Sequence, residues 1–541
     1  MVPTNLLNTR GLMVISPGPL LGSTVALMLF WAMRHGRERR LTWTSTPLPP
    51  RGYQVLPTAS TSPMLVRVGM TAEQPREGSP AFYDWVFTIM TRFHGKPWLL
   101  HRPGRPDVLV VSSPGAFEDI QRTFAVQFEK IEGDADGLAH DVHGGAIALV
   151  CSGQLHPSVN MQRQLAVSVL GSSTLRQQAS VLVEQHLDSL LRVLEAGSTG
   201  LDVRKMMQKF AMEVFTELGF GIQLGALRSP CYQASKLENA INDVQRRMAE
   251  RSQRPAVSWK LERLLDVGSE AALGRSIDVV NTITLEAVRA KRNKPRADSG
   301  CDNPLAGSRV DMLDLLLGQK CSSKRSKDPE FLAGFVLGLV VAARDSMTHA
   351  LTKCLQCLAQ NPQEQEKLLR DLKEAEDGGK DPRSIVRLEA VIKETLRLHP
   401  PKPFVRRRAR QDTVLNDGTF IAEGTEVAMD MYSMARRENV WGPDSAQFRP
   451  QRWIDATNSK LRPVSKYKFN AFLGGPRACL GADIALVELK TVVAAVISKV
   501  HLDAIEQSDD KNKALTRDVP CDEASRIQVR RRDLSRPGHY S

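Results

Sequence analysis

The chain has 541 residues, enough for one large unit or several smaller domains with a sizeable core. Hydrophobic residues make up 42% and charged residues 25%, which excludes a wholly disordered, collagen-like or multi-span membrane protein. The net charge of +13 favours an anionic membrane surface, an acidic protein partner or nucleic acid, and charge alone does not choose among them.

The N-terminal residues predict a membrane anchor. Residues 11–33 carry no charge and, at about 1.5 Å per residue, can just cross a hydrocarbon core of about 30 Å. Four arginines follow between positions 34 and 40, so the positive-inside rule places the rest of the chain in the cytosol. A cleaved signal peptide, or a shallow segment broken by Pro17 and Pro19, is the alternative. We expect an anchor with a basic flank over residues 1–45 and a Pro-rich hinge over residues 46–79.

Residues 80–541 have mostly helical periodicity, with apolar residues three and four positions apart in residues 175–194, 205–218 and 273–288. Short strand-like stretches occur at residues 108–112, 419–421, 426–429 and 527–531. The sequence therefore predicts a mainly α body with small β-sheets. Residues 291–308 and 320–327 are expected to form surface loops within this body rather than linkers.

One long helix is clearly delimited, with Asp328 as N-cap, Pro329 at the first position and Pro362 beyond the end. It is apolar nearly all round through residues 334–343, which predicts burial on every side. Asp345, Ser346 and Thr348 then interrupt the apolar run, either for chemistry or for local hydrogen bonds to the backbone. The Cys354/Cys357 pair has metal-ligand spacing but no second pair nearby, so we expect core packing.

Two motifs predict a buried ionic centre. Glu394 and Arg397 lie three residues apart on a helix that ends at His399-Pro400, which alone is a common surface pair. Arg452 stands downstream in the segment Phe448–Trp453, and a buried Glu394 shared between two guanidinium groups would be satisfied on both oxygens.

The segment Phe472–Gly481 (FLGGPRACLG) predicts a thiolate site. Its glycines allow backbone N–H groups to approach the sulfur of Cys479, and the following helix presents its positive end to a thiolate. Arg477 can reach an anionic group beside the cysteine. The alternative is a free structural cysteine in a Gly-rich turn.

These motifs (F-x-x-G-x-R-x-C-x-G, preceded by E-x-x-R and F-R-P-x-R-W) resemble the haem-binding signature of the cytochrome P450 family. The resemblance extends from about residue 80 to the end of the chain and implies that residues 80–541 are a haem-thiolate catalytic domain. It makes Cys479 the axial ligand of the iron of haem b. It also implies a structural triad of Glu394, Arg397 and Arg452 that braces the cysteine loop. The remaining cofactor-binding residues that it implies are Phe472, Gly475 and Gly481 in the loop, and Arg477, Arg407 and Arg163 for the haem propionates.

The long helix resembles the family's oxygen-activating segment, usually A-G-R-D-T-T. Ala343 stands where glycine is usual, and Ser346 where threonine is usual. The resemblance implies proton delivery through Asp345 and Ser346, with Thr348 as a substitute hydroxyl. Upstream, Arg163 is kept from the family's W-x-x-x-R pattern, while Val159 replaces the tryptophan and Pro157 disfavours a helix. Lys402 or Phe404 would contact substrate.

The resemblance implies a monooxygenase that inserts one atom of O₂ into a C–H bond of a lipophilic substrate. Electrons would come from NADPH through a flavoprotein reductase, and no nucleic-acid partner is expected. Three sequence features look most like the fatty-acid ω-hydroxylase branch, which suggests a long-chain fatty acid as substrate. They are the Arg-Asp-hydroxyl motif at residues 344–346, the Asp417–Thr419 turn and the segment Trp441–Asp444. The anchor and hinge resemble those of microsomal members, which implies a single-pass protein of the endoplasmic reticulum with its catalytic domain facing the cytosol.

Two other functions stay open. Haem-thiolate isomerases or dehydratases, which rearrange hydroperoxides without O₂ or reductase, also depart from the threonine pattern, although Asp345 and the uninterrupted cysteine loop count against them. Ala343 and the missing tryptophan are also compatible with a catalytically weak haem-binding protein. Product formation that depends on NADPH and reductase separates the first function from the other two.

Overall fold

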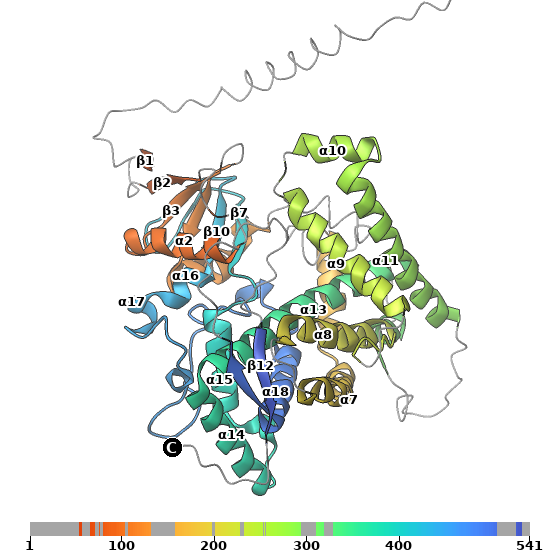
Figure 1. Cartoon of the computed structure of the whole chain (residues 1–541). Coiled ribbons are helices and arrows are strands. Elements are labelled where there is room, and N and C mark those ends of the chain that lie inside the picture. The colour runs from red at the N-terminus through yellow and green to blue at the C-terminus, as the bar shows by residue number, and fades with distance from the viewer. Residues whose placement is uncertain are drawn as a thin grey trace, which may run out of the picture.

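The computed structural model describes residues 53–56, 65–70, 75, 79–102, 106–130, 157–196, 201–227, 232–252, 254, 256–293, 310–318, 328–505 and 526–532. Helices make up most of this part, as predicted, and a mixed β-sheet lies to one side of them (Figure 1). The α-helices are α2 (Pro80–Arg92), α3 (Pro114–Glu118), α6 (Pro157–Leu170), α7 (Ser173–Glu195), α8 (Val203–Phe220), α9 (Tyr232–Ser252), α10 (Ala256–Leu264), α11 (Gly268–Asn293), α12 (Met312–Gly318), α13 (Pro329–Gln360), α14 (Pro362–Asp377), α15 (Val386–Leu398), α16 (Met431–Arg436), α17 (Glu438–Trp441) and α18 (Ala482–Lys499).

The strands form three sheets. The largest has the order β1-β2-β3-β4-β10-β7-β5, and smaller sheets have the orders β11-β12-β6 and β8-β9. The strands are β1 (Tyr53–Leu56), β2 (Leu65–Gly69), β3 (Trp98–His101), β4 (Val108–Val111), β5 (Phe128–Glu129), β6 (Leu201–Asp202), β7 (Phe404–Ala409), β8 (Thr413–Val414), β9 (Phe420–Ile421), β10 (Glu426–Asp430), β11 (Val500–Ala504) and β12 (Arg526–Arg531). β10 pairs with β4 in parallel and with β7 antiparallel, so residues more than 300 positions apart share one sheet. All four stretches with strand-like sequence contribute strands.

The residues predicted as a Pro-rich hinge also contribute to this sheet. Within residues 46–79, β1 pairs with β2 antiparallel, and β2 also pairs in parallel with β3, which lies further along the chain. The backbone groups of these two strands are therefore bonded into the body, so this part of the predicted hinge belongs to the sheet. The predicted anchor, residues 1–45, lies outside the described residues.

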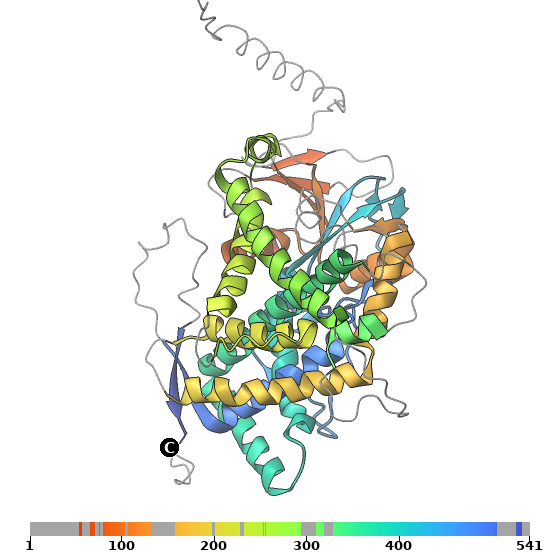
Figure 2. The same ribbon diagram turned by 90° about the vertical axis from the view of Figure 1, so that its right-hand side faces the viewer.

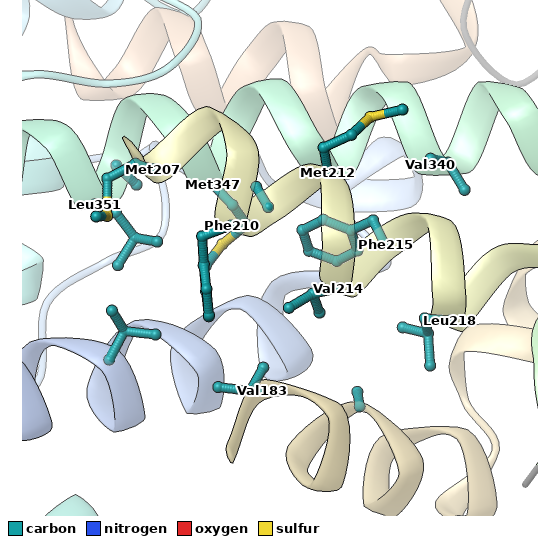
Figure 3. Packing of buried hydrophobic residues seen from close by; sticks show 14 of the residues in the cluster. Val183, Met207, Phe210, Met212, Val214, Phe215, Leu218, Val340, Met347 and Leu351 are labelled. Atoms are coloured by element: carbon teal, nitrogen blue, oxygen red, sulfur yellow. The ribbon is translucent and has the colours of Figure 1, made fainter. Parts of the chain in front are cut away.

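The core is organised around α13 and α8. Residues Phe210–Phe220 of α8 are buried on every side. Figure 3 shows why: α8 lies between neighbours, with Met207 beside Leu351 of α13 and Val214 toward Val183 of α7. The two axes approach closely at Gly219, where an added Cβ would lie 2.5 Å from Val340 Cγ2. α13 thus runs through the middle of the helical body (Figure 2).

The predicted bounds of α13 agree with the structure to within one residue, but the predicted burial on every side is wrong. One strip of the helix stays accessible: Ala342 and Asp345 are exposed, and Gly338, Leu339 and Ser346 are half-buried. Its opposite side packs in the core. An accessible strip along an otherwise apolar helix is a surface that a ligand can cover.

Among the described residues, α13 is also the helix that is long and apolar enough to cross a bilayer. Most of that stretch is buried inside the protein, so its apolar character reflects core packing.

Candidate functional site

The structure brings the three residues of the predicted triad together. The Arg397 guanidinium donates to both oxygens of Glu394, from Nε to Oε2 at 2.7 Å and from Nη2 to Oε1 at 2.9 Å. Arg452 Nε donates to Oε1 at 3.1 Å, and the indole N–H of Trp453 donates to Oε2 at 2.9 Å. The Glu394 carboxylate is inaccessible to solvent and fully paired. Two guanidinium groups therefore share this carboxylate: Arg397 spans both oxygens, and Arg452 bonds Oε1 alone.

The triad extends into the segment that follows α17. Arg397 Nη1 donates to the carbonyl of Ser445 at 2.7 Å, and Arg452 Nη1 donates to Asp444 Oδ1 at 2.8 Å. Hydrogen bonds from Arg452 and Arg449 lower the pKa of Asp444 to about 2. These bonds connect α15 to the segment that leads toward the cysteine loop.

The cysteine loop is held by a residue that lies far away in the sequence. Gln121, in the helical turn η1 (Asp119–Thr123), accepts from the backbone N–H of Gly474 at 2.5 Å and donates to Asn470 Oδ1 at 2.7 Å. Gly475 has φ of +62°, and an added Cβ would lie 1.8 Å from the carbonyl oxygen of Gln121. Glycine is therefore required at 475 by conformation and by contact.

The predicted reason for the three loop glycines is confirmed only in part. Gly474 and Gly475 approach Gln121 rather than the sulfur, whereas the backbone N–H of Gly481 bonds Cys479. A Cβ at Gly481 would meet nothing within 4 Å, so open space lies beside the loop there.

Cys479 is an exposed free cysteine, unlike Cys354 and Cys357, which are buried. Partial burial by the surrounding loop raises its thiol pKa, while the Gly481 N–H and the Arg163 charge act in the opposite direction. Its backbone N–H donates to the carbonyl of Phe472 at 2.8 Å, which closes the loop. A sulfur held this way, with one side open, is suited to bind a metal ion that displaces its proton.

The three predicted propionate ligands lie near the loop, and Arg477 is close enough to Arg407 and to Arg163 for their charges to repel. Burial and the Arg477 charge lower the pKa of Arg407 to about 10, and burial and the Arg163 charge lower the pKa of Arg477. Arg163 Nη2 also donates to the carbonyl of Ala478 at 3.3 Å, next to the cysteine. Arg163 belongs to α6, which begins at Pro157, the helix position where proline is tolerated, so α6 forms despite that proline. Clustered guanidinium groups are stabilised by an anion, and carboxylates of a ligand would supply it.

The residues predicted for proton delivery do not all lie on the same side of α13. Asp345 and Ser346 belong to the accessible strip, whereas Thr348 is buried. The Thr348 hydroxyl has no hydrogen-bond partner within the described part of the chain. Its role as a substitute hydroxyl stays a prediction, as do the roles of Asp345 and Ser346.

The other predicted contacts have mixed surroundings. Lys402 is exposed just before β7, while Phe404 packs against Phe82 with ring centroids 5.9 Å apart. Cys354 and Cys357 pack in the core, where burial raises the pKa of each thiol to about 12. The core-packing prediction for this pair is confirmed.

Sequence reasoning missed several residues of this region. Gln121 lies 353 positions from Gly474, and no local motif marks it. The buried Arg344 was visible only as part of the Arg-Asp text, and its partners on α9 were not identified. Glu488 of α18 is buried, and burial raises its pKa to about 8; its place nine residues after Cys479 was the available signal.

The donor set fits a haem. An exposed thiol with an open side can ligate the iron, and the clustered arginines Arg163, Arg407 and Arg477 match two propionate carboxylates. The accessible strip of α13 supplies a further surface for a large apolar ligand to cover.

Comparisons with known proteins identify the family. The family model for cytochrome P450 matches residues 83–524. Cytochrome P450 94C1 of Arabidopsis thaliana is 30% identical over 354 residues, covering 62% of this chain and 68% of that protein. Cytochrome P450 94A1 of Vicia sativa is 28% identical over 63% of this chain. The match covers 66% of that relative's length, slightly less than two thirds. Cytochrome P450 94B1 of Arabidopsis thaliana is 30% identical, covering 73% and 76%. The chain therefore belongs to the cytochrome P450 family, the haem-thiolate monooxygenases that hold haem b on a cysteine.

Proposed function

We propose that the protein hydroxylates a lipophilic substrate, using O₂ and electrons that a flavoprotein reductase transfers from NADPH. The observation that carries the proposal is the exposed Cys479 thiol in a loop held by Gln121, next to Arg477, which is repelled by Arg163 and in turn repels Arg407. The overall reaction consumes one O₂, two electrons and two protons, placing one oxygen atom in the new C–O–H group and releasing the other as water.

Each part of the chain has a physical task in this reaction. Haem bound to a thiolate supplies the redox-active iron and the electron density that favours O–O cleavage. Cys479 would hold the iron, and Arg163, Arg407 and Arg477 would hold the carboxylates of the cofactor. The Glu394 triad and Gln121 would keep the loop rigid, which fixes the position of the sulfur.

Asp345 and Ser346 are proposed to deliver protons from the accessible strip of α13. Ser346 lacks the methyl group that restricts a threonine hydroxyl, so we expect less efficient proton delivery than with threonine. Ser346→Thr should therefore raise the amount of product formed per NADPH consumed.

The proposed substrate class is a long-chain fatty acid or a similar lipid. Support comes from the similarity to relatives that carry the 94 designation and from the sequence features of the ω-hydroxylase-like branch.

The test of the thiolate ligand is the absorption spectrum of the reduced, CO-bound protein. We expect the band characteristic of thiolate ligation in the parent protein and its loss in Cys479→Ala. Cys357→Ala is the matched control, because this buried cysteine packs in the core and should leave the band unchanged. A thiolate band that survives in Cys479→Ala would refute the assignment.

The test of the reaction is product formation from long-chain fatty acids. We expect hydroxylated product only when NADPH, O₂ and a reductase are all present. Turnover of a lipid hydroperoxide without an electron source would instead indicate an isomerase or dehydratase. Ser346 is compatible with that alternative, because such enzymes also depart from the threonine pattern.

We also propose attachment to the endoplasmic reticulum membrane, with the catalytic domain facing the cytosol. Besides the apolar N-terminal sequence, α10 supports a lipid contact in the described part of the chain. Val257, Leu261 and Leu264 are 79%, 54% and 81% exposed, at helical spacings of four and three residues. Lys260 and Arg263 flank this stripe, as expected for a helix lying on an anionic lipid surface. α10 and β1, the first described strand, lie at the same end of the molecule in both views (Figures 1 and 2).

A further inference from the structure

We propose that Gln245 of α9 is a positioning residue that fixes the carboxylate of Asp345. The inference rests on the proposed function, because it assigns a supporting group to the residue that would deliver protons. It also assigns α9 a part in catalysis that its sequence did not indicate.

The starting observation is a buried charge. The Arg344 side chain is 1% exposed, and its guanidinium forms an ion pair with Asp345, Nη2 to Oδ1 at 2.8 Å. Nε donates to the same oxygen at 2.9 Å. Since a guanidinium stays protonated in proteins, its burial requires acceptors on several sides.

Gln245 supplies one acceptor and closes the arrangement. Its Oε1 accepts from Arg344 Nη2, and its Nε2 donates to Asp345 Oδ2. Arg344 therefore holds one oxygen of the Asp345 carboxylate and Gln245 holds the other. With both oxygens bonded, the carboxylate cannot turn about its χ angles without breaking a charge-assisted hydrogen bond.

A second amide anchors the same guanidinium. Arg344 Nη1 donates to Asn242 Oδ1 at 3.1 Å, and the same oxygen accepts from Gln208 Nε2 of α8 at 2.8 Å. Asn242 and Gln245 lie three residues apart and so share one face of α9. The two amides bind α9 to α13 through Arg344, with α8 as the third support.

The position of α9 thereby sets the orientation of Asp345. α9 is joined to the next two helices by Arg251, which stacks on Trp259 at 3.6 Å and pairs with Glu270 at 3.4 Å. A shift of this helical unit, for instance when substrate enters, would pull Gln245 away from Asp345. The carboxylate would then be held by Arg344 alone.

The experiment compares variants of the full-length haem protein. Gln245→Leu removes both hydrogen bonds at similar volume. Gln245→Glu can still accept from Arg344 but cannot donate to Asp345. Asn239→Ala, at an exposed amide of the same helix, is the matched control.

In both Gln245 variants we expect product per NADPH to fall about tenfold, as when a catalytic group is misplaced. Substrate affinity, measured by spectral titration, should change less than about twofold, because Gln245 binds Asp345 rather than substrate. Hydrogen exchange of the α9 amides in substrate-free ferric protein should become faster, which is a readout independent of turnover. Asn239→Ala should match the parent throughout.

A double-variant cycle separates positioning from a general structural effect. If Gln245 acts through Asp345, adding Gln245→Leu to Asp345→Asn should not lower product per NADPH further. An additive loss would overturn the inference, and so would parental product per NADPH in either Gln245 variant. If the parent protein forms no product at all, the proposed function fails. If hydrogen exchange of the α9 amides is unchanged in Gln245→Leu, the hydrogen bonds of Gln245 to Arg344 and Asp345 are refuted.

Discussion

The most constrained single residue of the cysteine loop is Gly475, because two separate requirements meet there. Its φ of +62° disfavours any side chain, and the carbonyl oxygen of Gln121 occupies the space where a Cβ would be. The contact involves backbone on both sides, so no side-chain rotation can relieve it.

We therefore predict that Gly475→Ala lowers the free energy of unfolding by about 2–3 kcal/mol or more and weakens haem retention. The checks are thermal unfolding and the haem-to-protein absorbance ratio. Gly115→Ala is the control: Gly115 lies in α3 with nothing within 4 Å of its added Cβ, and we expect a change within about 0.5 kcal/mol. Equal losses of stability and haem retention in the two variants would contradict the proposal that the contact between Gly475 and Gln121 holds the cysteine loop.

Glu394 is a second residue whose substitution should lower the stability of the fold. Glu394→Gln leaves two guanidinium groups without their carboxylate in a buried site, which should cost about 3–5 kcal/mol of stability. Glu389→Gln, on the same helix, breaks the ion pairs to Lys393 and Lys490, which are partly exposed, and should cost about 1 kcal/mol or less. Denaturant unfolding of both variants measures the difference.

The residues that sequence reasoning found and missed differ in one respect. Cys479, Arg477, Glu394 and Arg397 stand in short motifs whose spacing is legible along the chain. Gln121 and Gln245 act on loops or helices that only the fold brings near them, so their neighbours in sequence carry no signal. Burial decides the rest, and burial is a property of the folded chain.

At the scale of elements, α18 carries an unusual buried acid. Glu488 is 2% exposed, and its Oε1 has no hydrogen-bond partner among the described residues. Burial raises its pKa from the ordinary 4.5 to about 8. Between these two values the folded protein holds a proton that the unfolded chain has released.

Stability should therefore fall as the pH rises from about 4.5 to 8 and stop changing on this account above 8, with a slope of at most about 1.4 kcal/mol per pH unit. Glu488→Gln should remove this component and raise the thermal midpoint at pH 7.5 relative to the parent. Thermal scans of both proteins from pH 5 to 9 test it. Parallel pH profiles would show that Glu488 is ionised in the folded state.

α13 illustrates what periodicity and capping residues can and cannot predict. Asp328, Pro329 and Pro362 located its ends correctly, because these residues act locally on the backbone. Its environment was predicted wrongly, because an apolar run is the same whether core side chains or a bound ligand covers it. Only the packed structure shows that Ala342 is exposed while Val340 is buried.

At the scale of the whole molecule, the helical class was predictable and the sheet order was not. The pairing of β4 with β10 and the inclusion of β1 and β2 depend on contacts between distant segments. The residue pattern of a single sequence predicts that strands exist but not which strands are neighbours in a sheet.

The apolar stripe on α10 leads to a prediction for the intact protein in a lipid nanodisc. We expect the amides of α10 to exchange more slowly in nanodiscs than in detergent, because lipid excludes water from that surface. The triple variant Val257→Gln, Leu261→Gln and Leu264→Gln should lose this protection. Val126→Gln, at a residue outside α10 that is 72% exposed, is the control. Protection of α10 that survives the triple change would argue against lipid contact.

The charged residues Arg344 and Asp345 in the middle of α13 have a consequence for biosynthesis. A ribosome feeding this chain to the insertion machinery of a membrane presents a 32-residue helix with the length and hydropathy of a transmembrane segment. Arg344 and Asp345 stand at its midpoint, where each charged residue disfavours partitioning into lipid by about 2.5–3.5 kcal/mol. Arg344 and Asp345, the two charges that are bonded to α9 in the folded protein, would thus keep this helix of the nascent chain out of the bilayer.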